Sequence, residues 1–269
     1  MNNIFDLNTY SVAFAERRDI GEEWNEVKWN RNHFHVQYHR LYFPTSGRAE
    51  IRLLNKTIEL ECGRVYFIPA YSVTESRIDG QMNKFYVHFQ VDSPFFELYR
   101  YMSDTYSVEA NSHTEYLFNT VLENYSDKSM VARHRVQGAM NLIMADFFKD
   151  ISVDRRSILK FEPVLAYVSE HYRENIRLCT LAGLINVSTM YFSNAFKKVF
   201  NISPKQFILN KRLTESQRLL LETEMSVKEI AYAVGFENES YFSEFFSAKV
   251  GISALRFRNR EAPKRDSIL

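Results

Sequence analysis

The sequence has few of the residues that mark secreted, fibrous or membrane-spanning proteins. It contains only 2 cysteines, Cys62 and Cys179, and they lie too far apart for a zinc motif or a disulfide framework. With 8 glycines and 6 prolines, collagen-like and low-complexity chains are excluded. No apolar run approaches the roughly 20 residues of a membrane span, and the N-terminus lacks a signal-peptide pattern. These absences predict a soluble cytoplasmic protein with reduced thiols.

The chain has almost no excess of charge of either sign, but its acidic and basic residues are unevenly distributed. The chain has 269 residues, enough for about two domains, and a formal net charge of +1. Residues 1–154 hold 16 Lys and Arg against 21 Asp and Glu, a net charge of −5, whereas residues 155–269 hold 18 against 12, a net charge of +6. The basic half is the natural candidate for a polyanionic partner, and chance clustering is the alternative.

The front half has the pattern of an antiparallel sheet. Apolar and polar residues alternate in short segments rich in β-branched and aromatic residues, and turn residues recur every 8–12 positions, for example at 44–47. This spacing is typical of a β-sandwich or β-barrel. The expected strands are residues 36–43, 49–54, 57–60, 65–68 and 84–91.

From about residue 113 the apolar period changes to that of helices. A short helix is expected over 115–125, and a longer one carries an apolar stripe at spacings of three and four. We interpret this stripe as a two-fold dimer contact, with a role in the core of its own domain as the alternative. Its members are Val136, Met140, Ile143 and Phe147.

The rear half contains an internal repeat. Leu181-Ala182 matches Ile230-Ala231 at an offset of 49, and Tyr191-Phe192-Ser193 matches Tyr241-Phe242-Ser243 at an offset of 50. One residue is added between these blocks, in the turn that contains Gly235-Phe236. Each copy predicts a short helix, a turn and a second helix, which is the helix-turn-helix (HTH) layout.

Capping residues and helix faces support this interpretation. Ser188 and Asn238 are the expected N-caps of the two second helices, and Ser203 caps a connecting helix that begins at Pro204. In the first copy, Phe192 and Phe196 face the core at i and i+4, so the polar residues between them face outward. A connector of about 18 residues would be ~27 Å long and could place two recognition helices in successive major grooves.

Residues 159–260 resemble the AraC/XylS-type DNA-binding domain. The resemblance rests on residues 188–198 (STMYFSNAFKK) and 226–243 (SVKEIAYAVGFENESYFS) and covers about 40% of the chain. It implies a transcription regulator, with double-stranded promoter DNA, RNA polymerase and a second copy of the chain as partners. The implied DNA-contacting residues are Ser188, Thr189, Met190, Ser193, Asn194, Lys197, Lys198, Lys205, Glu239, Ser240, Ser243, Glu244, Arg256 and Arg258.

The chain departs from the family pattern in its second repeat. Family members often carry Arg at the positions of Asn194 and Glu244, and a Pro where Ala254 stands. Asn194 can still read adenine, whereas Glu244 either accepts from a cytosine amine or is repelled by phosphates. In the second case this helix contributes mainly shape, and Lys197, Lys198, Lys205, Arg256 and Arg258 hold the phosphates.

Residues 33–91 resemble the cupin-type sensing barrel that often precedes such a domain, on residues 60–70 and 87–89. The resemblance implies a small effector inside the barrel; a sugar, a phenolic acid and an acidic metabolite all suit its aromatic strands. Expected contacts are His33, His35, Tyr42, Arg52 and His88. His33, His35 and His39 match half of a cupin metal motif, but no His follows Pro69, so we expect no metal and no cofactor.

Together these observations predict a two-domain α+β protein: an N-terminal cupin-like β-barrel with flanking helices, and a C-terminal all-α domain with two HTH motifs. The expected boundaries are 1–150 for the sensing and dimerisation domain, 151–158 for a linker, 159–262 for the DNA-binding domain and 263–269 for a tail. We expect a DNA-binding activator controlled by an effector and not an enzyme. Two alternatives are a cupin enzyme with a helical tail and a protein-binding antagonist that has lost DNA contact.

Overall fold

The computed structural model describes residues 9–20, 38–53, 56–91, 106–149 and 155–261. The chain divides into two compact units, residues 1–152 and 153–269. No helix in the described part of the chain is long and apolar enough to cross a bilayer.

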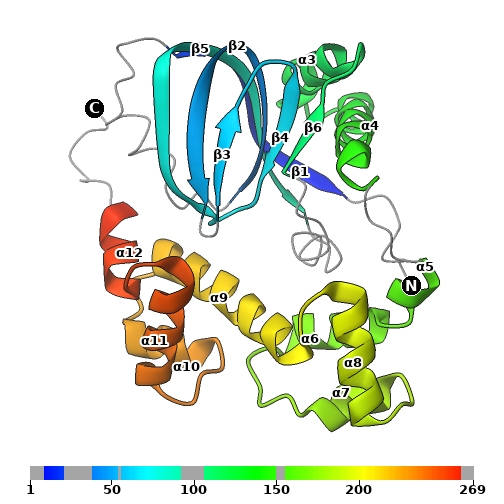
Figure 1. Ribbon diagram of the computed structural model, residues 1–269, viewed down its shortest axis with the longest axis vertical. Helices are drawn as coiled ribbons and strands as arrows, with labels where there is room; N and C mark the ends of the chain where they lie inside the picture. The colour runs from blue at the N-terminus through cyan, green and yellow to red at the C-terminus, as the bar shows by residue number, and fades with distance from the viewer. Residues whose placement is uncertain (1–8, 21–37, 54–55, 92–105, 150–154, 262–269) are drawn as a thin grey trace. The chain divides into compact units, whose positions relative to one another are not determined.

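The N-terminal unit is built on one six-stranded antiparallel sheet in the order β1-β5-β2-β4-β6, with β3 paired to β2 (Figure 1). The two longest strands, β2 and β5, form its centre and pair along most of their length. The strands are β1 (Tyr10–Ile20), β2 (His39–Leu53), β3 (Thr57–Leu60), β4 (Arg64–Ile68), β5 (Val73–Val91) and β6 (Ser107–Glu109).

The turn that we expect at residues 44–47 is a bend inside β2. The pairing of β2 with β5 shifts its register between Pro44 and Ser46 and again between Ser46 and Arg48, which is the pattern of a β-bulge. Gly47 has φ +72°, and a Cβ there would lie 1.9 Å from the carbonyl oxygen of Gln81. A glycine therefore lets the strand bend against its neighbour and continue, so two expected strands are one.

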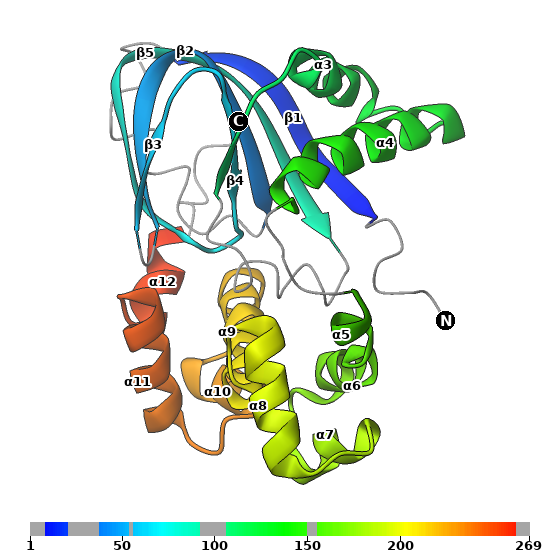
Figure 2. The same cartoon turned by 45° about the vertical axis from the view of Figure 1, so that its right-hand side comes forward.

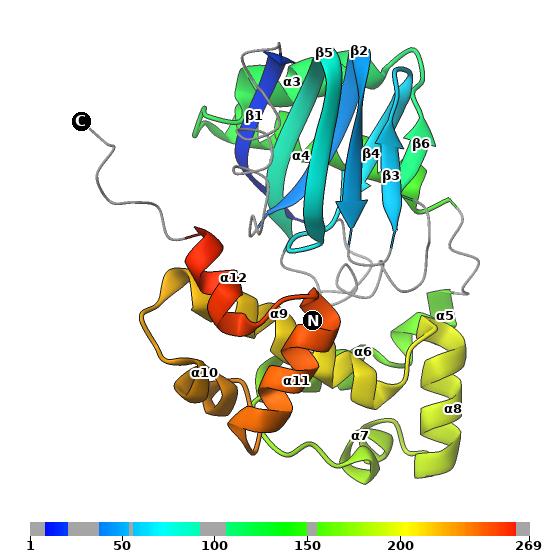
Figure 3. The same ribbon diagram turned by 60° about the vertical axis from the view of Figure 1, so that its left-hand side comes forward.

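Two helices, α3 (Thr114–Asn124) and α4 (Met130–Phe147), cover one face of the sheet (Figures 2 and 3). Ser129 caps α4 by accepting from the amide of Ala132. Odd-numbered strand residues such as Leu41 and Phe85 pack with Phe118 and Met140 in the core between the sheet and these helices.

This core corrects the expected dimer contact. The apolar stripe of α4 is at most 6% exposed and packs against the sheet of its own unit, so it is not available to a second chain. Helical periodicity identifies the buried face of a helix but not the surface that buries it. The corrected residues are Val136 (6% exposed), Met140 (0%), Ile143 (4%) and Phe147 (0%).

The C-terminal unit is all helical among its described residues. Its helices are α5 (Arg155–Leu159), α6 (Glu162–His171), α7 (Leu178–Leu184), α8 (Thr189–Phe200), α9 (Pro204–Glu222), α10 (Val227–Ala233), α11 (Glu239–Val250) and α12 (Ala254–Glu261). Because α5 begins at Arg155 and Ile158 is buried, the expected linker of residues 151–158 is too long at its C-terminal end.

Two aromatic clusters form the cores of this unit, one for each repeat. In the first, the rings of Phe161 and Phe196 are 5.4 Å apart, and Phe207 at the start of α9 lies 5.9 Å from Phe196. In the second, Phe246 lies 5.3 Å from Phe257 of α12. Helix α9 runs between the two repeats and contributes to both (Figure 1).

Candidate nucleic-acid interface

The first repeat consists of α7 and α8, and its second helix begins as the sequence predicts. The hydroxyl of Ser188 accepts from the amide of Tyr191 at 3.3 Å, and Asn201 ends α8 in the left-handed conformation. Phe192, Phe196 and Phe200 are buried, so the opposite face of α8 is polar and open to solvent. Ser193 on this face is half-buried, and the exposed residues are Ser188, Thr189, Met190, Asn194, Lys197 and Lys198.

The second repeat, α10 and α11, has the same construction. Asn238 accepts from the amide of Tyr241 at 2.8 Å, and Gly251 ends α11 in the left-handed conformation that Asn201 adopts in the first repeat. Ser226 and Glu229 form a capping box on α10. On the open face of α11, Ser243 is half-buried, and the exposed residues are Glu239, Ser240 and Glu244.

The two open faces differ in charge. Helix α8 presents Lys197 and Lys198 in its last turn, whereas the turn and first half of α11 present Glu237, Glu239 and Glu244, all exposed. Carboxylates close to phosphates repel them, so the first repeat is electrostatically the better partner for a polyanion.

Of the three further basic residues that we expect to hold phosphates, two are exposed and one is not free to do so. Lys205 at the start of α9 and Arg256 on α12 are open to solvent. The guanidinium of Arg258 instead donates from Nε to the carbonyl oxygen of Leu220 at 3.2 Å and from Nη2 to that of Met225. It joins α12 to the end of α9, so we correct its assignment: its role is structural.

Sequence reasoning missed a cleft between the repeats. Its volume is about 520 Å³, and it is lined by Arg173, Asn175 and Lys205 from the side of the first repeat and by Tyr232, Glu237 and Asn238 from the second. Arg173 and Asn175 lie in the segment between α6 and α7, where no sequence motif marks them. Only the packing of the two repeats, which brings Arg173 and Asn175 close to Lys205, identifies these two residues as part of the cleft.

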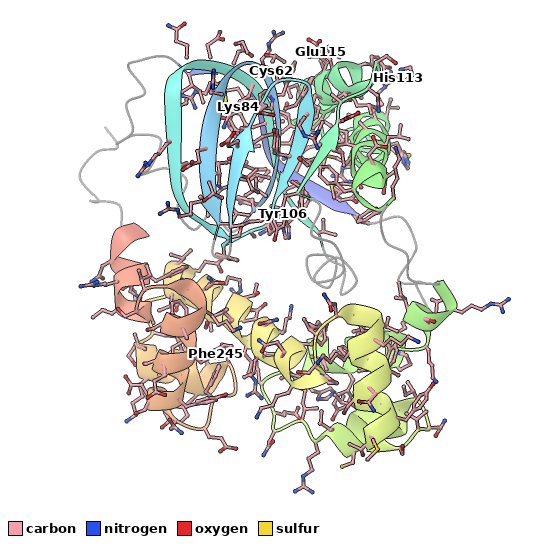
Figure 4. All side chains as sticks on the ribbon, in the orientation of Figure 1. Cys62, Lys84, Tyr106, His113, Glu115 and Phe245 are labelled. Carbon is pink, nitrogen blue, oxygen red and sulfur yellow. The ribbon has the colours of Figure 1, made fainter. Side chains whose placement is uncertain are left out.

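In the N-terminal unit, the face of the sheet turned away from α3 and α4 holds a polar cluster within an otherwise apolar core. We call Arg40, Tyr42, Lys84, Tyr86 and His88 the inner cluster. Arg40 pairs in register with His88, and Tyr42 with Tyr86, across β2 and β5. Arg40 and Lys84 are each only 2% exposed, and Lys84 lies on β5 (Figure 4).

Burial and neighbouring basic groups shift the pKa values of two members of the inner cluster. The Nζ of Lys84 lies 3.8 Å from the centre of the Tyr42 ring. Burial, and then the positive charges of Arg40 and Arg18, hold the pKa of Lys84 well below its usual value. Burial, followed by Arg40 and Lys84, lowers the pKa of His88 to about 3, so this imidazole is neutral near pH 7. The phenol of Tyr86 donates to Oε2 of Glu16 at 2.5 Å.

The expected effector contacts divide into three groups. Tyr42 and His88 lie in the inner cluster. Arg52 is exposed, between the buried Ile51 and Leu53, so the alternation of β2 directs it outward and our inward assignment is wrong. His33 and His35 lie outside the described residues. Arg40 and Lys84 are the members that sequence reasoning missed, because an alternating strand predicts an apolar inner face.

Comparisons with known proteins identify the C-terminal motif. Residues 181–260 match the family model described as a helix-turn-helix domain. The chain is 35% identical over 97 residues to an uncharacterized HTH-type transcriptional regulator, YdiP of Escherichia coli, covering 36% of this chain and 32% of that protein. It is 23% identical to the Msm operon regulatory protein of Streptococcus mutans, covering 95% of each. Among solved structures, ToxT of Vibrio cholerae matches with a TM-score of 0.55 and 14% identity, over 94% of this chain and 98% of that one.

The repeated motif and the family match identify residues 181–260 as a helix-turn-helix domain. The whole chain has a two-domain fold similar to that of ToxT, with an N-terminal antiparallel β-sheet domain and a C-terminal helical domain that carries the HTH region, and it is similar in sequence to transcription regulators. The fold expected from the sequence is confirmed.

Proposed function

We propose that this chain is a sequence-specific transcription activator that binds promoter DNA through both repeats, recruits RNA polymerase and responds to a small effector held by its N-terminal unit. The observation that carries the proposal is the pair of capped recognition helices, each with a buried aromatic face and an open polar face. We place its action in the cytoplasm and propose no enzymatic activity.

The direct test of DNA binding is a titration of the full chain with its own upstream DNA at several salt concentrations. Lys and Arg that neutralise phosphates release counterions, so the logarithm of the binding constant should fall linearly with the logarithm of the salt concentration. An absence of binding at low salt would favour a protein-binding antagonist. The exposed acidic residues Glu237, Glu239 and Glu244 are the observation behind that second candidate.

For the effector we propose an organic anion, bound at the inner cluster. Two buried basic side chains, Arg40 and Lys84, lie on one face of the sheet, and a carboxylate is the group that would favour the charged form of both. ToxT, whose fold is similar, has been solved bound to an unsaturated fatty acid and to a substituted butenoic acid. The fold likeness and the local charge together support an acid rather than a neutral sugar.

A thermal-shift screen can separate these effector classes. Carboxylic acids and their matched neutral amides should be added to the full chain, because a ligand that binds only the folded state raises the melting temperature. We expect acids to raise it and amides not to. Arg40→Gln and Lys84→Gln should abolish the shift, whereas Arg52→Gln, on the outward side of β2, should keep it. Equal shifts with amides would contradict an anionic effector.

We further propose that the chain forms a homodimer through the outward face of α4, in place of the buried stripe. Exposed Val131 and Leu142 (60% and 61% exposed) lie on this face with Gly138 between them. Among the described residues, a Cβ added to Gly138 would meet nothing within 4 Å, so none of them explains a glycine that costs about 0.5–1 kcal/mol in a helix.

An antiparallel pairing of two α4 helices explains both features. A two-fold axis midway between Gly138 and Leu142 would place the partner's Leu142 over Gly138, and the same contact would be repeated by symmetry. It would also bring Arg135 near the partner's Asp146, an attraction between opposite charges. The open position at Gly138 and the exposed Leu142 are therefore complementary in shape, although Asp146 also pairs with Lys149 of its own chain at 2.5 Å.

A further inference from the structure

Arg212, near the middle of α9, contacts the segment that precedes the first repeat and the turn of the second repeat. Its Nε donates to the carbonyl oxygen of Tyr172 at 2.7 Å, and its Nη2 donates to that of Glu174 at 2.7 Å. Both carbonyls follow α6, in the segment that leads into the first repeat. The guanidinium carbon also lies 5.7 Å from the centre of the Phe236 ring, in the turn of the second repeat.

A second contact joins the same two segments directly. Gly235 has φ +93°, and a Cβ there would lie 2.4 Å from the carbonyl oxygen of Arg173 and 2.8 Å from its carbonyl carbon. These are backbone atoms, which cannot move aside as a flexible side chain can. The turn of the second repeat therefore rests on the backbone of the segment that precedes the first, and only glycine allows this approach.

Phe236 carries the contact into the second recognition helix. It is 3% exposed, and its ring lies 5.2 Å from that of Phe242 and 5.6 Å from that of Phe245, both on α11. Figure 4 labels Phe245 on this helix. A change in the position of Phe236 would therefore also change the position of α11. Arg212 binds the segment that leads into the first repeat with two directional hydrogen bonds, and it contacts the turn of the second repeat through the Phe236 ring, at a point remote from the ends of α9.

We propose that Arg212 and Gly235 fix the separation and rotation of the two recognition helices, and so determine the spacing of the two DNA patches that one chain can read. The proposal rests on the proposed DNA-binding function. A rigid pair of recognition helices binds without an ordering cost but tolerates only one spacing. Inserting one base pair rotates the second patch by about 34°, because one helical turn takes 10 to 10.5 base pairs.

The first experiment measures the geometry without DNA. Spin labels are attached at Lys198→Cys on α8 and at Ala248→Cys on α11, equivalent exposed positions of the two repeats, in a full chain whose Cys62 and Cys179 are replaced by Ser. Because the proposed homodimer would carry four labels, the labelled chain is mixed with an excess of unlabelled chain, and we expect one narrow distance distribution within the protomer from pulsed electron spin resonance. Arg212→Ala and Gly235→Ala should broaden or shift it. An unchanged distribution in both variants would overturn the proposal.

The matched control is Arg218→Ala. Arg218 also lies on α9, but its side chain donates to Glu215 and Glu222 of the same helix, at 3.1 and 2.6 Å. Arg218→Ala should therefore give the same distance distribution as the parent chain. Arg212→Lys keeps the charge but cannot make both hydrogen bonds in the planar geometry of a guanidinium, so it should give an intermediate width.

The second experiment measures the consequence on DNA. The full chain is titrated with its upstream site and with versions that carry one or two extra base pairs between the protected patches. We expect the parent chain and Arg218→Ala to lose at least tenfold in affinity per insertion. Arg212→Ala should bind the natural spacing about tenfold more weakly and lose less than threefold on insertion. A parent-like profile for Arg212→Ala would contradict the proposal, whereas no DNA binding by the parent chain, with the distance result intact, would contradict the proposed function instead.

Discussion

Lys84 lies with its Nζ 3.8 Å from the centre of the Tyr42 ring, and both side chains are buried in the same face of the sheet. A cation there costs desolvation energy, and its lowered pKa expresses that cost. We interpret the pair as part of a binding site, because functional sites commonly retain such destabilising groups.

Replacing Lys84 should change the stability of the chain and its response to carboxylic acids in opposite directions. Lys84→Met keeps the length of the side chain and removes the buried amine, so the effector-free chain should gain free energy of unfolding because burial disfavours the charged form of the lysine. The same variant should lose the thermal shift with carboxylic acids. Urea unfolding and the thermal-shift screen measure the two effects. A variant that is destabilised and still responds to acids would contradict this role for Lys84.

His88 gives the N-terminal unit a dependence on pH. Its folded pKa is about 3, whereas an unfolded histidine titrates near 6.5, so between these values the unfolded state binds a proton that the folded state does not. The free energy of unfolding is therefore highest above pH 6.5, where His88 is neutral in both states, and it decreases as the pH falls toward 3. From pH 6.5 to 5 we expect a loss of about 2 kcal/mol in free energy of unfolding.

Urea unfolding of the parent chain and of His88→Gln at several pH values measures this effect. The difference between the two chains should grow steadily as the pH falls below 6.5, because only the parent chain carries His88. A difference that stays constant from pH 7 to 5 would show that His88 titrates normally in the folded protein.

The dimer proposal predicts that exposed residues of α4 control assembly. Leu142→Glu should give a monomer by analytical ultracentrifugation, and Gly138→Leu should do the same by filling the position expected to receive the partner's Leu142. Leu255→Glu changes an equally exposed leucine (56% exposed) of the other unit and should leave the dimer intact. A dimer that survives both α4 variants would place the contact elsewhere.

In the first recognition helix, base reading and phosphate binding should be separable. Asn194→Ala should cost roughly 1–3 kcal/mol at its cognate base and relax specificity there. Lys197→Ala should weaken binding to all sequences about equally and reduce the salt dependence by about one ion. Competition titrations with single-base operator variants measure both. If neither change affects binding, α8 is not a recognition helix.

One substitution, Glu244→Arg, tests how the charge of the second recognition helix affects DNA binding. If α11 acts mainly by shape, Glu244→Arg should strengthen binding to many sequences and steepen the salt dependence by about one ion. If Glu244 accepts from a cytosine amine, the same change should weaken the true operator. A titration of operator and unrelated DNA at fixed salt distinguishes the two outcomes. We expect the first, because Glu237 and Glu239 are also exposed on this repeat.

Local signals in the sequence were sufficient for the elements of the rear half. Ser188, Ser203 and Asn238 each cap the helix that the pattern predicts, and α9 ends within one residue of its expected end. Caps and helical periodicity act over a few residues, so they can be recognised without the fold. The bend at Gly47 misled us because a turn and a bulge use the same residue types.

The remaining features depend on contacts that only the tertiary structure reveals. No pattern near Arg212 in the sequence predicts its hydrogen bonds to the carbonyls of Tyr172 and Glu174, which lie some forty residues away. Arg258 looks like a phosphate contact until its hydrogen bonds to Leu220 and Met225 are seen. Likewise, the apolar stripe of α4 shows that something covers it, but only the fold shows that the cover is its own sheet.

The central claim is that one chain reads two successive major grooves, and a methylation-interference footprint of the full chain on its upstream DNA tests it most directly. The account predicts two patches of major-groove interference per protomer, with centres about 10 to 10.5 base pairs apart. Asn194→Ala should remove sensitivity within one patch and leave the other. A single patch per protomer would contradict the account, because α11 would then not enter the DNA.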